Sequence, residues 1–318
     1  MFIKPLQIPT KLERLDALLR RLAVTHPKYE RIKSERIRRY AGYIGEKLVA
    51  YQLKTIDEDH YSILHDLCLK IGDLHFQIDF LLLTTRYVLI IETKNFAGTL
   101  LFDDQGQFIR ILNEQQEGYS DPVAQSQYHQ RCLRKWLSSH HFPTLPVDYV
   151  VVVSKPSSII KMENTDPEIR KRVLPASKLS AYVDHLNHFP NETIDLKTQR
   201  KLCKQFLKMH SPYYSNLLKE YNLAEKDLFR GVQCPECFFL PMTPFKGHWR
   251  CPSCNCKSKD ADQKAVQDYF LLIGPTITNR QLRDFLQISS VQKSRRLLTS
   301  MNLPYTGDKK GRIYYQRK

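Results

Sequence analysis

The stretch Ile90-Ile91-Glu92-Thr93-Lys94-Asn95 places an acid and a base two residues apart at the end of an apolar run. Because side chains two apart on a strand lie on the same face, Glu92 and Lys94 are expected to point the same way. Asp79 stands in a second apolar run, 75–83, and only Thr84-Thr85-Arg86 separates the two runs. This tight link predicts an antiparallel hairpin that brings Asp79 close to Glu92.

A carboxylate pair of this kind has a specific chemistry. Two carboxylates brought together repel each other, and a hard cation such as Mg²⁺ relieves the repulsion through oxygen ligands. The ammonium of Lys94 can orient an attacking water and offset charge that develops on a phosphate. An acid and a base two apart on a strand more often form a surface ion pair. Here the surrounding runs are apolar enough to be interior, where unpaired charge is costly, and this favours a functional site.

The segments around this stretch alternate between helical and strand-like patterns. Apolar spacing predicts a helix over 11–24 and a second from Tyr29 to Tyr51, which contains Gly42 and Gly45. Two glycines inside a helix cost about 1 kcal/mol each, so something is expected to pack closely there. Further along the chain the patterns predict three strands, at 62–69, 75–83 and 87–91, and then a hairpin of 99–102 with 108–112. A helix capped by Asp121 is predicted over 122–139, and a buried strand follows it at 147–153.

Several short motifs, taken together and in this order, resemble the nuclease-related domain family, NERD. They are Gly42-Tyr43-Ile44-Gly45-Glu46, Gln77-Ile78-Asp79, Ile91-Glu92-Thr93-Lys94-Asn95 with Gly98, and Pro122-Val123-Ala124-Gln125 with His129. The resemblance covers about residues 37–155. The family is assigned to the PD-(D/E)XK nuclease superfamily, so the resemblance implies an α/β, restriction-endonuclease-like core of helix, three-stranded meander, helix and strand. The periodicity predicts the same order.

The resemblance also implies roles for individual residues. Asp79 and Glu92 correspond to the ligands of a catalytic Mg²⁺ or Mn²⁺, and Lys94 to the catalytic lysine. Glu46 would project from the first helix towards the metal. Gln125 resembles the glutamine of the helix motif in exonuclease-like members, which often have a tyrosine where this chain has His129. A packing role for His129 stays open.

Four cysteines form two matched pairs, Cys234-Pro235-Glu236-Cys237 and Cys251-Pro252-Ser253-Cys254. Four thiolates at this spacing can close a tetrahedral Zn²⁺ site in a small ribbon, and such a site is structural because it leaves no open position. A redox dithiol is the main alternative. His248 and Cys256 are spare donors, and His248 is expected in a strand that enters the second pair.

The C-terminal segment is basic and helical. Patterns predict helices over 262–273, 278–286 and 291–301 and a hairpin of 303–305 with 312–315, an order that resembles a winged helix. A small helical packing module with a solvated basic face is the alternative. On the winged-helix reading, the third helix and the wing contact DNA through Gln292, Lys293, Arg295, Arg296, Lys309, Lys310 and Arg312.

Charge and composition limit the possible partners. The 318 residues carry a formal net charge of +16, and 42% are hydrophobic, which is enough for a sizeable core. Residues 1–40 hold 11 basic and 4 acidic side chains, and residues 257–318 hold 13 and 5, so the middle is nearly neutral. No stretch reaches the length of a membrane span and no signal peptide is recognisable, so we expect a cytoplasmic protein without membrane contact. The scattered cysteines outside the two pairs fit a reducing compartment.

These observations predict five segments: a basic helical segment (1–36), a nuclease-like domain (37–155), a loop and helical connector (156–230), a zinc ribbon (231–257) and a winged-helix-like domain (258–318). The favoured function is a divalent-metal-dependent DNA nuclease of DNA processing or repair. A non-catalytic DNA-binding adaptor that keeps the nuclease fold is the first alternative, and an RNA-processing nuclease is the second.

Overall fold

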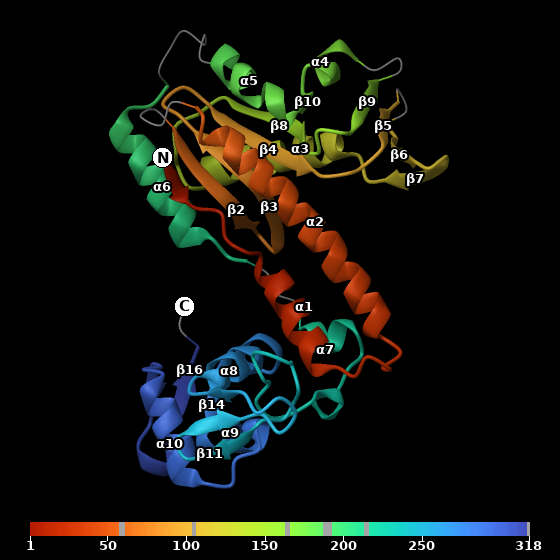
Figure 1. The fold of residues 1–318 in the computed structure, drawn as a ribbon. Coiled ribbons are helices and arrows are strands. Elements are labelled where there is room, and N and C mark those ends of the chain that lie inside the picture. Colours follow the sequence, from red (N-terminus) through yellow and green to blue (C-terminus); the bar gives the residue numbers. More distant parts are fainter. Residues whose placement is uncertain (57–60, 104–105, 163–165, 187–192, 213–215, 317–318) are drawn as a thin grey trace. The chain divides into compact units, whose positions relative to one another are not determined.

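The computed structural model describes residues 1–316 apart from 57–60, 104–105, 163–165, 187–192 and 213–215 (Figure 1). The chain divides into two compact units. The first unit holds residues 1–9 and 38–213, and the second holds residues 10–37 and 214–318. The long helix α2 (Tyr29–Leu53) contributes residues to both. None of the described helices is long and apolar enough to cross a membrane.

A six-stranded mixed sheet forms the centre of the first unit. Its strands, in spatial order, are β1 (Phe2–Lys4), β2 (Ser62–Ile71), β3 (Leu74–Leu83), β4 (Val88–Lys94), β8 (Val147–Val153) and β10 (Val173–Pro175). The strands β2, β3 and β4 form an antiparallel meander, whereas β8 runs parallel to β4. With α2 before the meander and α3 (Pro122–Ser139) before β8, the predicted order of elements is confirmed.

Helices cover both faces of this sheet. On one face Trp136 of α3 and Phe206 of α6 (Leu196–Met209) share a core with Val88 and Ile90 of β4. On the other face α2 and α5 (Leu179–Leu186) pack against the alternate residues of β4, such as Leu89. Continuing the alternation along β4 places Glu92 and Lys94 on the α3 face.

The side-chain alternation changes phase in the middle of β3. Ile78 and Leu81 both belong to the core on the α3 face, although an undisturbed strand would send residues three apart to opposite faces. The neighbouring strand changes phase at Asp66, whose φ of 51° lies in the left-handed region. Asp79 therefore occupies an irregular position at which a simple alternating pattern does not predict the direction of the side chain.

A smaller sheet in the first unit contains β7 (Gln115–Tyr119), β6 (Phe108–Leu112), β5 (Thr99–Phe102) and β9 (Ile159–Met162). The predicted hairpin of β5 and β6 is confirmed. The segment 154–176 looks like a surface loop in the sequence, but it contains β9, the short helix α4 (Pro167–Arg170) and β10. Both strands pair in parallel with strands distant in the sequence, β9 with β5 and β10 with β8, which local patterns do not reveal.

The second unit begins with α1 (Thr10–Arg21), as predicted. Its apolar residues Leu15 and Leu18 are buried in a cluster that also contains Leu217 of α7 (Leu217–Glu220) and Leu271 of α8 (Ala261–Leu272). The N-terminal basic helix is thus part of the same core as α8.

Short antiparallel sheets and helices complete the second unit (Figure 1). One sheet consists of β11 (Thr243–Phe245), β12 (His248–Arg250) and β13 (Lys257–Ser258), and the predicted strand at His248 is confirmed. The other sheet has the order β14, β16, β15. The remaining elements of this unit are β14 (Thr276–Thr278), α9 (Asn279–Leu286), α10 (Val291–Ser300), β15 (Tyr305–Thr306), β16 (Ile313–Tyr315) and the 3₁₀ turns Glu225–Asp227 and Lys309–Gly311. A further 3₁₀ turn, Ala176–Lys178, belongs to the first unit. The predicted helices and hairpin are confirmed, whereas β14 was not foreseen.

The basic helix α1 is held by a buried ion pair. Arg21 is 1% exposed, and its Nε lies 2.9 Å from Oδ2 of Asp268 on α8. Its Nη1 donates to the carbonyl oxygens of Phe229 and Gly231, at 3.0 and 3.2 Å. Arg20 binds the second oxygen of Asp268 at 2.7 Å.

We expect Arg21→Ala to lower the free energy of unfolding by about 3–5 kcal/mol, because the change leaves buried carbonyls and one side of a buried carboxylate without a donor. Urea unfolding followed by circular dichroism measures this. Arg14→Ala on the same helix is the control with a smaller expected loss, since Arg14 is only half-buried and its Nε donates to the carbonyl oxygen of Leu271 and not to a buried carboxylate. A loss below about 1 kcal/mol for Arg21→Ala would contradict a structural role for the pair.

Candidate functional site

Four polar side chains meet on the α3 face at the end of β4. The Nζ atom of Lys94 lies 2.7 Å from Oε1 of Glu92 and 3.1 Å from Oε1 of Gln125 on α3. His129, one turn further along α3, places Nδ1 3.8 Å from Oε2 of Glu92. Glu92 is only 3% exposed, whereas Lys94 remains partly accessible. The structure therefore brings together Glu92, Lys94 and Gln125 as an interacting group, with His129 beside them.

The sequence of α3 explains how Gln125 and His129 reach this position. Asp121 caps the helix and accepts hydrogen bonds from the N–H groups of Val123 and Ala124. Pro122 occupies the first turn, where a missing N–H costs nothing. Burial lowers the pKa of His129, which keeps its imidazole neutral beside Glu92.

Asp79 lies beside this group on β3. The register pairs Phe80 with Ile91, and one further step along it places Asp79 opposite Glu92. Oδ2 of Asp79 accepts a hydrogen bond from the backbone N–H of Thr93 at 2.9 Å. Burial, followed by the charges of Glu92 and Glu46, raises the pKa of Asp79 well above its usual value. The charges of Glu92 and Glu46 thus disfavour the ionised form of Asp79.

The raised pKa of Asp79 predicts that its charge destabilises the fold. We expect Asp79→Asn to raise the free energy of unfolding at pH 7 by on the order of 1 kcal/mol. In the unfolded chain Asp79 ionises near its ordinary pKa, whereas in the folded protein it ionises only at a higher pH. The wild type therefore loses stability as the pH rises from the unfolded-state pKa of Asp79 towards its folded-state pKa. The gain from the variant should be absent below about pH 4 and grow with pH. Urea unfolding of both proteins in metal-free buffer at pH 3.5, 5 and 7 measures it; equal stability at pH 7 would contradict the prediction.

Glu46 on α2 bonds to a histidine of β2. Its Oε2 lies 2.7 Å from Nε2 of His65 on β2, a residue that is 1% exposed and whose ring packs on Phe80. Within the described residues, the ligand atoms of Glu46, Asp79 and Glu92 do not form a group within 4.8 Å. Glu46 is nevertheless close enough for its charge to raise the pKa of Asp79. His65 was missed, because a single histidine in an apolar strand carries no local signal.

A close helix–sheet contact brings α2 to this end of the sheet. A Cβ atom added at Gly45 would lie 2.5 Å from Cβ of Asn95 and 2.6 Å from Oγ of Ser154, distances too short for any other residue. Nδ2 of Asn95 also donates to the carbonyl oxygen of Ala41. The expected close packing holds for Gly45, whereas a Cβ at Gly42 would meet nothing within 4 Å.

The donor set fits a hard divalent cation. Oε2 of Glu92 is buried and has no hydrogen-bond partner among the described residues, although a buried carboxylate oxygen normally has one. Asp79 adds a second carboxylate whose charge is unfavourable without a counter-charge. Oxygen ligands of this type suit Mg²⁺ or Mn²⁺.

The four paired cysteines converge in the second unit. The Sγ atoms of Cys234, Cys237, Cys251 and Cys254 all lie within 4.8 Å of one another. Cys234 and Cys251 are buried, and the backbone N–H of Phe239 lowers the pKa of the Cys237 thiol to about 6. This arrangement is consistent with structural zinc. Cys256 and His248 lie outside the group that the described residues form.

The residues expected to contact DNA differ in their surroundings. Gln292, Arg295 and Arg296 are exposed on α10. Lys293 instead lies with Nζ 4.6 Å from the ring centre of Trp249, and burial lowers its pKa. Lys309 is exposed, the guanidinium of Arg312 lies 4.0 Å from the ring centre of Tyr305, and the side chain of Lys310 lies outside the described residues.

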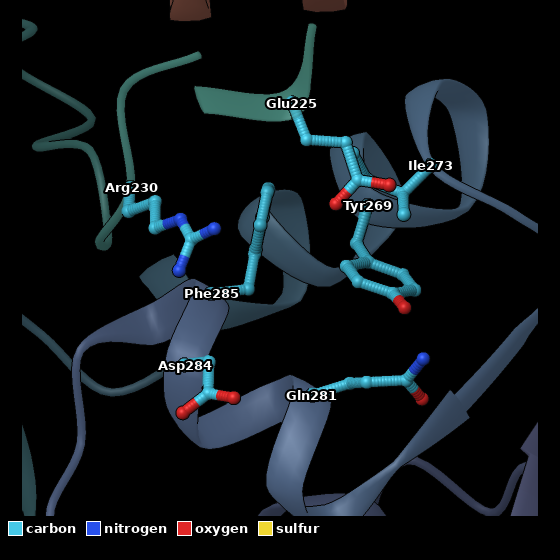
Figure 2. A pocket seen from close by; sticks show the side chains of 7 residues that line it. All are labelled: Glu225, Arg230, Tyr269, Ile273, Gln281, Asp284 and Phe285. Carbon is cyan, nitrogen blue, oxygen red and sulfur yellow. The ribbon is translucent and has the colours of Figure 1, made fainter. Parts of the chain in front are cut away.

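A small cavity of about 150 Å³ occurs elsewhere, in the second unit. Figure 2 shows acidic, basic and aromatic side chains around it, from the segment 225–230 and from α8 and α9. Its lining residues are Glu225, Arg230, Tyr269, Ile273, Gln281, Asp284 and Phe285. None of them belongs to a motif that the sequence predicts to be functional. Gln281 already closes the capping box of α9 through Thr278, so part of the polar lining serves the fold.

Comparisons with known proteins match part of the chain to a known family. Residues 41–154 match the family model for the nuclease-related domain, NERD. Over 117 residues the chain is 25% identical to an uncharacterized protein of Bacillus anthracis, and the matched part covers 36% of this chain and 54% of that protein. The chain thus spans about half the length of this curated relative. No solved structure matches the chain. The protein carries a nuclease-related domain over residues 41–154, and a four-cysteine cluster consistent with a zinc ribbon follows it in the C-terminal part.

Proposed function

We propose that this protein is a divalent-metal-dependent DNA nuclease with a PD-(D/E)XK-type core. The observation that carries the proposal is the group at the end of β4, where Lys94 bonds one oxygen of Glu92 and the other oxygen is buried without a partner among the described residues. A nuclease-related domain covers the same residues. A surface ion pair explains neither the burial of Glu92 nor the raised pKa of Asp79.

The side chains would divide the work as follows. Asp79 and Glu92 would hold Mg²⁺ or Mn²⁺, with Glu46 behind Asp79. Bound there, the cation would supply Lewis-acid polarisation of the phosphate and lower the pKa of a coordinated water. Lys94 would orient the attacking water and neutralise charge on the phosphate, and Gln125 holds Lys94 in place through its 3.1 Å contact.

The second unit would hold the nucleic acid. The proposal is supported by the order α8, β14, α9, α10, β15 and β16, with β16 between the other two strands, which resembles the order in a winged helix. On this proposal α10 reads DNA through Gln292, Arg295 and Arg296, and the wing adds Lys309, Lys310 and Arg312. Lys293 would support Trp249 instead of binding phosphate. The zinc-ribbon segment, 231–257, would precede this DNA-holding domain.

A cleavage assay tests the proposal. The purified full-length protein is incubated with supercoiled circular, linear duplex and single-stranded DNA, with Mg²⁺, with Mn²⁺ or without added metal. We expect cleavage only with metal, and the circular substrate distinguishes endonuclease from exonuclease action. Absence of cleavage on all three DNAs, while DNA is still bound, would refute the nuclease proposal. Cleavage of a matched RNA in preference to DNA would instead support an RNA-processing enzyme.

One observation favours a non-catalytic adaptor as the second candidate. Glu46 is bonded to His65, so the three carboxylates do not form a closed ligand set within the described part of the chain. An adaptor would bind DNA with equal affinity in the presence and absence of Mn²⁺, and it would show no heat of Mn²⁺ binding. A nuclease should bind Mn²⁺ in a manner that depends on Asp79 and Glu92.

A further inference from the structure

The zinc-ribbon sheet has one buried and one exposed face. Trp249 of β12 is 2% exposed and lies in the core with Ala265 and Val266 of α8. Its neighbours on β12, His248 and Arg250, alternate to the opposite face. Cross-strand pairing adds to that face Phe245 opposite His248, and Thr243 and Lys257 opposite Arg250. We call Thr243, Phe245, His248, Arg250 and Lys257 the aromatic–basic face.

The centre of this face is an exposed phenylalanine ring surrounded by cations. Phe245 is 38% exposed. The guanidinium of Arg250 lies 5.6 Å from its ring centre, the ammonium of Lys246 lies 5.7 Å away, and the ring of His248 meets it edge-on at 5.4 Å. No described carboxylate forms an ion pair with Lys246, Arg250 or Lys257 within this part of the chain.

The backbone under this face is held firmly. Arg250 directly precedes Cys251 of the cysteine cluster, and its Nη2 donates to Oδ1 of Asn255 at 3.0 Å. Thr243 Oγ1 donates to the carbonyl oxygen of Arg250. A ring and a guanidinium on such a base lose little freedom when a ligand binds. Two further phenylalanines in the first cysteine turn, Phe238 and Phe239, are 68% and 42% exposed.

We propose that the aromatic–basic face binds single-stranded DNA, with an unpaired base stacked on Phe245 and the adjacent phosphates held by Arg250, Lys246 and Lys257. The uncompensated positive charge argues for an anionic partner. An exposed ring among cations is the arrangement that stacks unpaired bases, whereas the bases of a duplex are stacked on one another and cannot reach it. This site is separate from the carboxylate group at β4 and does not depend on cleavage.

Fluorescence anisotropy of a labelled 12-nucleotide oligo(dT), measured with the full-length protein and no added divalent metal, tests the proposal. Phe245→Ala should weaken binding by about 5- to 150-fold, which is the range that loss of one stacked base produces. Phe245→Tyr keeps a ring face and should bind within about 3-fold of the wild type. Phe229→Ala is the matched control, because Phe229 is 48% exposed but lies outside this sheet.

The other substrates and variants distinguish stacking from general charge attraction. Arg250→Ala should weaken oligo(dT) binding. It should also reduce the slope of log K against log[salt] by about one, which corresponds to the loss of one phosphate contact. Binding of a 12-base-pair duplex should be unaffected by Phe245→Ala. Wild-type affinity of Phe245→Ala for oligo(dT), an equal loss for the duplex, or tighter binding of oligo(rU) than oligo(dT) would each overturn the proposal. Equal zinc content in all variants shows that the ribbon is intact, and a failure of DNA cleavage would leave these binding results unaffected.

Discussion

Glu92→Gln is expected to reduce metal-dependent DNA cleavage by at least about 10²–10³-fold, the loss typical of removing one preorganised charged group from an active site. The substitution preserves the size of the side chain but removes the charge that would hold the cation and that Lys94 contacts at 2.7 Å. Lys94→Ala should have a comparable effect. Among the described residues, Lys94 is the one lysine or arginine that forms an ion pair with Glu92, and the other neighbour, His129, is an imidazole at 3.8 Å. Initial rates of plasmid cleavage in Mn²⁺ measure both losses.

Glu117→Gln is a suitable control for these variants. Glu117 lies on β7, is exposed and contacts Arg110 and Tyr119 away from the carboxylate group. Its cleavage rate should equal that of the wild type. If Glu92→Gln and Lys94→Ala also cleave DNA at the wild-type rate, then the group at the end of β4 is not the active site.

The second large effect concerns the cysteine cluster. Cys251→Ser should remove bound zinc and unfold the ribbon, because the buried Cys251 and Cys234 share a core with Trp249. In small domains that fold around zinc, metal binding contributes about 10–16 kcal/mol, so loss of the metal outweighs the other interactions of a short segment. We expect one zinc per chain in the wild type and less than about one tenth of that in the variant. Metal analysis and limited proteolysis of the intact protein measure the two effects.

Cys256→Ser tests whether Cys256 is a zinc ligand. Cys256 lies outside the group of four Sγ atoms, although its carbonyl oxygen accepts the N–H of Cys251. The variant should keep its zinc, because a serine leaves the backbone bond unchanged. Loss of zinc from Cys256→Ser, or full zinc retention by Cys251→Ser, would contradict the four-cysteine assignment.

Much of the first unit could be predicted because its signals are local. The cap at Asp121, the proline that follows it and the short link between β3 and β4 each act over a few residues, and together they place Gln125 and Glu92 on the same face. The spacing of the cysteines likewise predicts their convergence. The resemblance of the motifs to the nuclease-related domain is confirmed over residues 41–154.

Features that depend on distant contacts could not be predicted. The change of side-chain alternation at Asp79 on β3 occurs together with the left-handed backbone of Asp66 on the neighbouring strand β2. Neither residue belongs to a sequence pattern that predicts such a change. The bond of Glu46 to His65 joins a helix and a strand through two residues without a motif. The strands β9 and β10 exist because they pair with β5 and β8, and their own sequences resemble loops.

The positive charge of the N-terminal segment also has a different role from the one its total implies. Arg20 and Arg21 bind Asp268, and Arg36 binds Asp16 at 2.8 Å. Part of the positive charge that would be expected to bind nucleic acid is therefore used in ion pairs that stabilise the second unit. The formal charge of +16 indicates an anionic partner, but the contacts of each side chain decide which cations remain available.

Crystals soaked in Mn²⁺ and measured at a wavelength where manganese scatters anomalously provide the most direct test of the proposed nuclease site. Our proposal predicts an anomalous peak bound by oxygens of Asp79 and Glu92, and its disappearance in Glu92→Gln crystals soaked in the same way. Anomalous density confined to the cysteine cluster or the surface, with none at Asp79 and Glu92, would contradict the proposal and favour the DNA-binding adaptor.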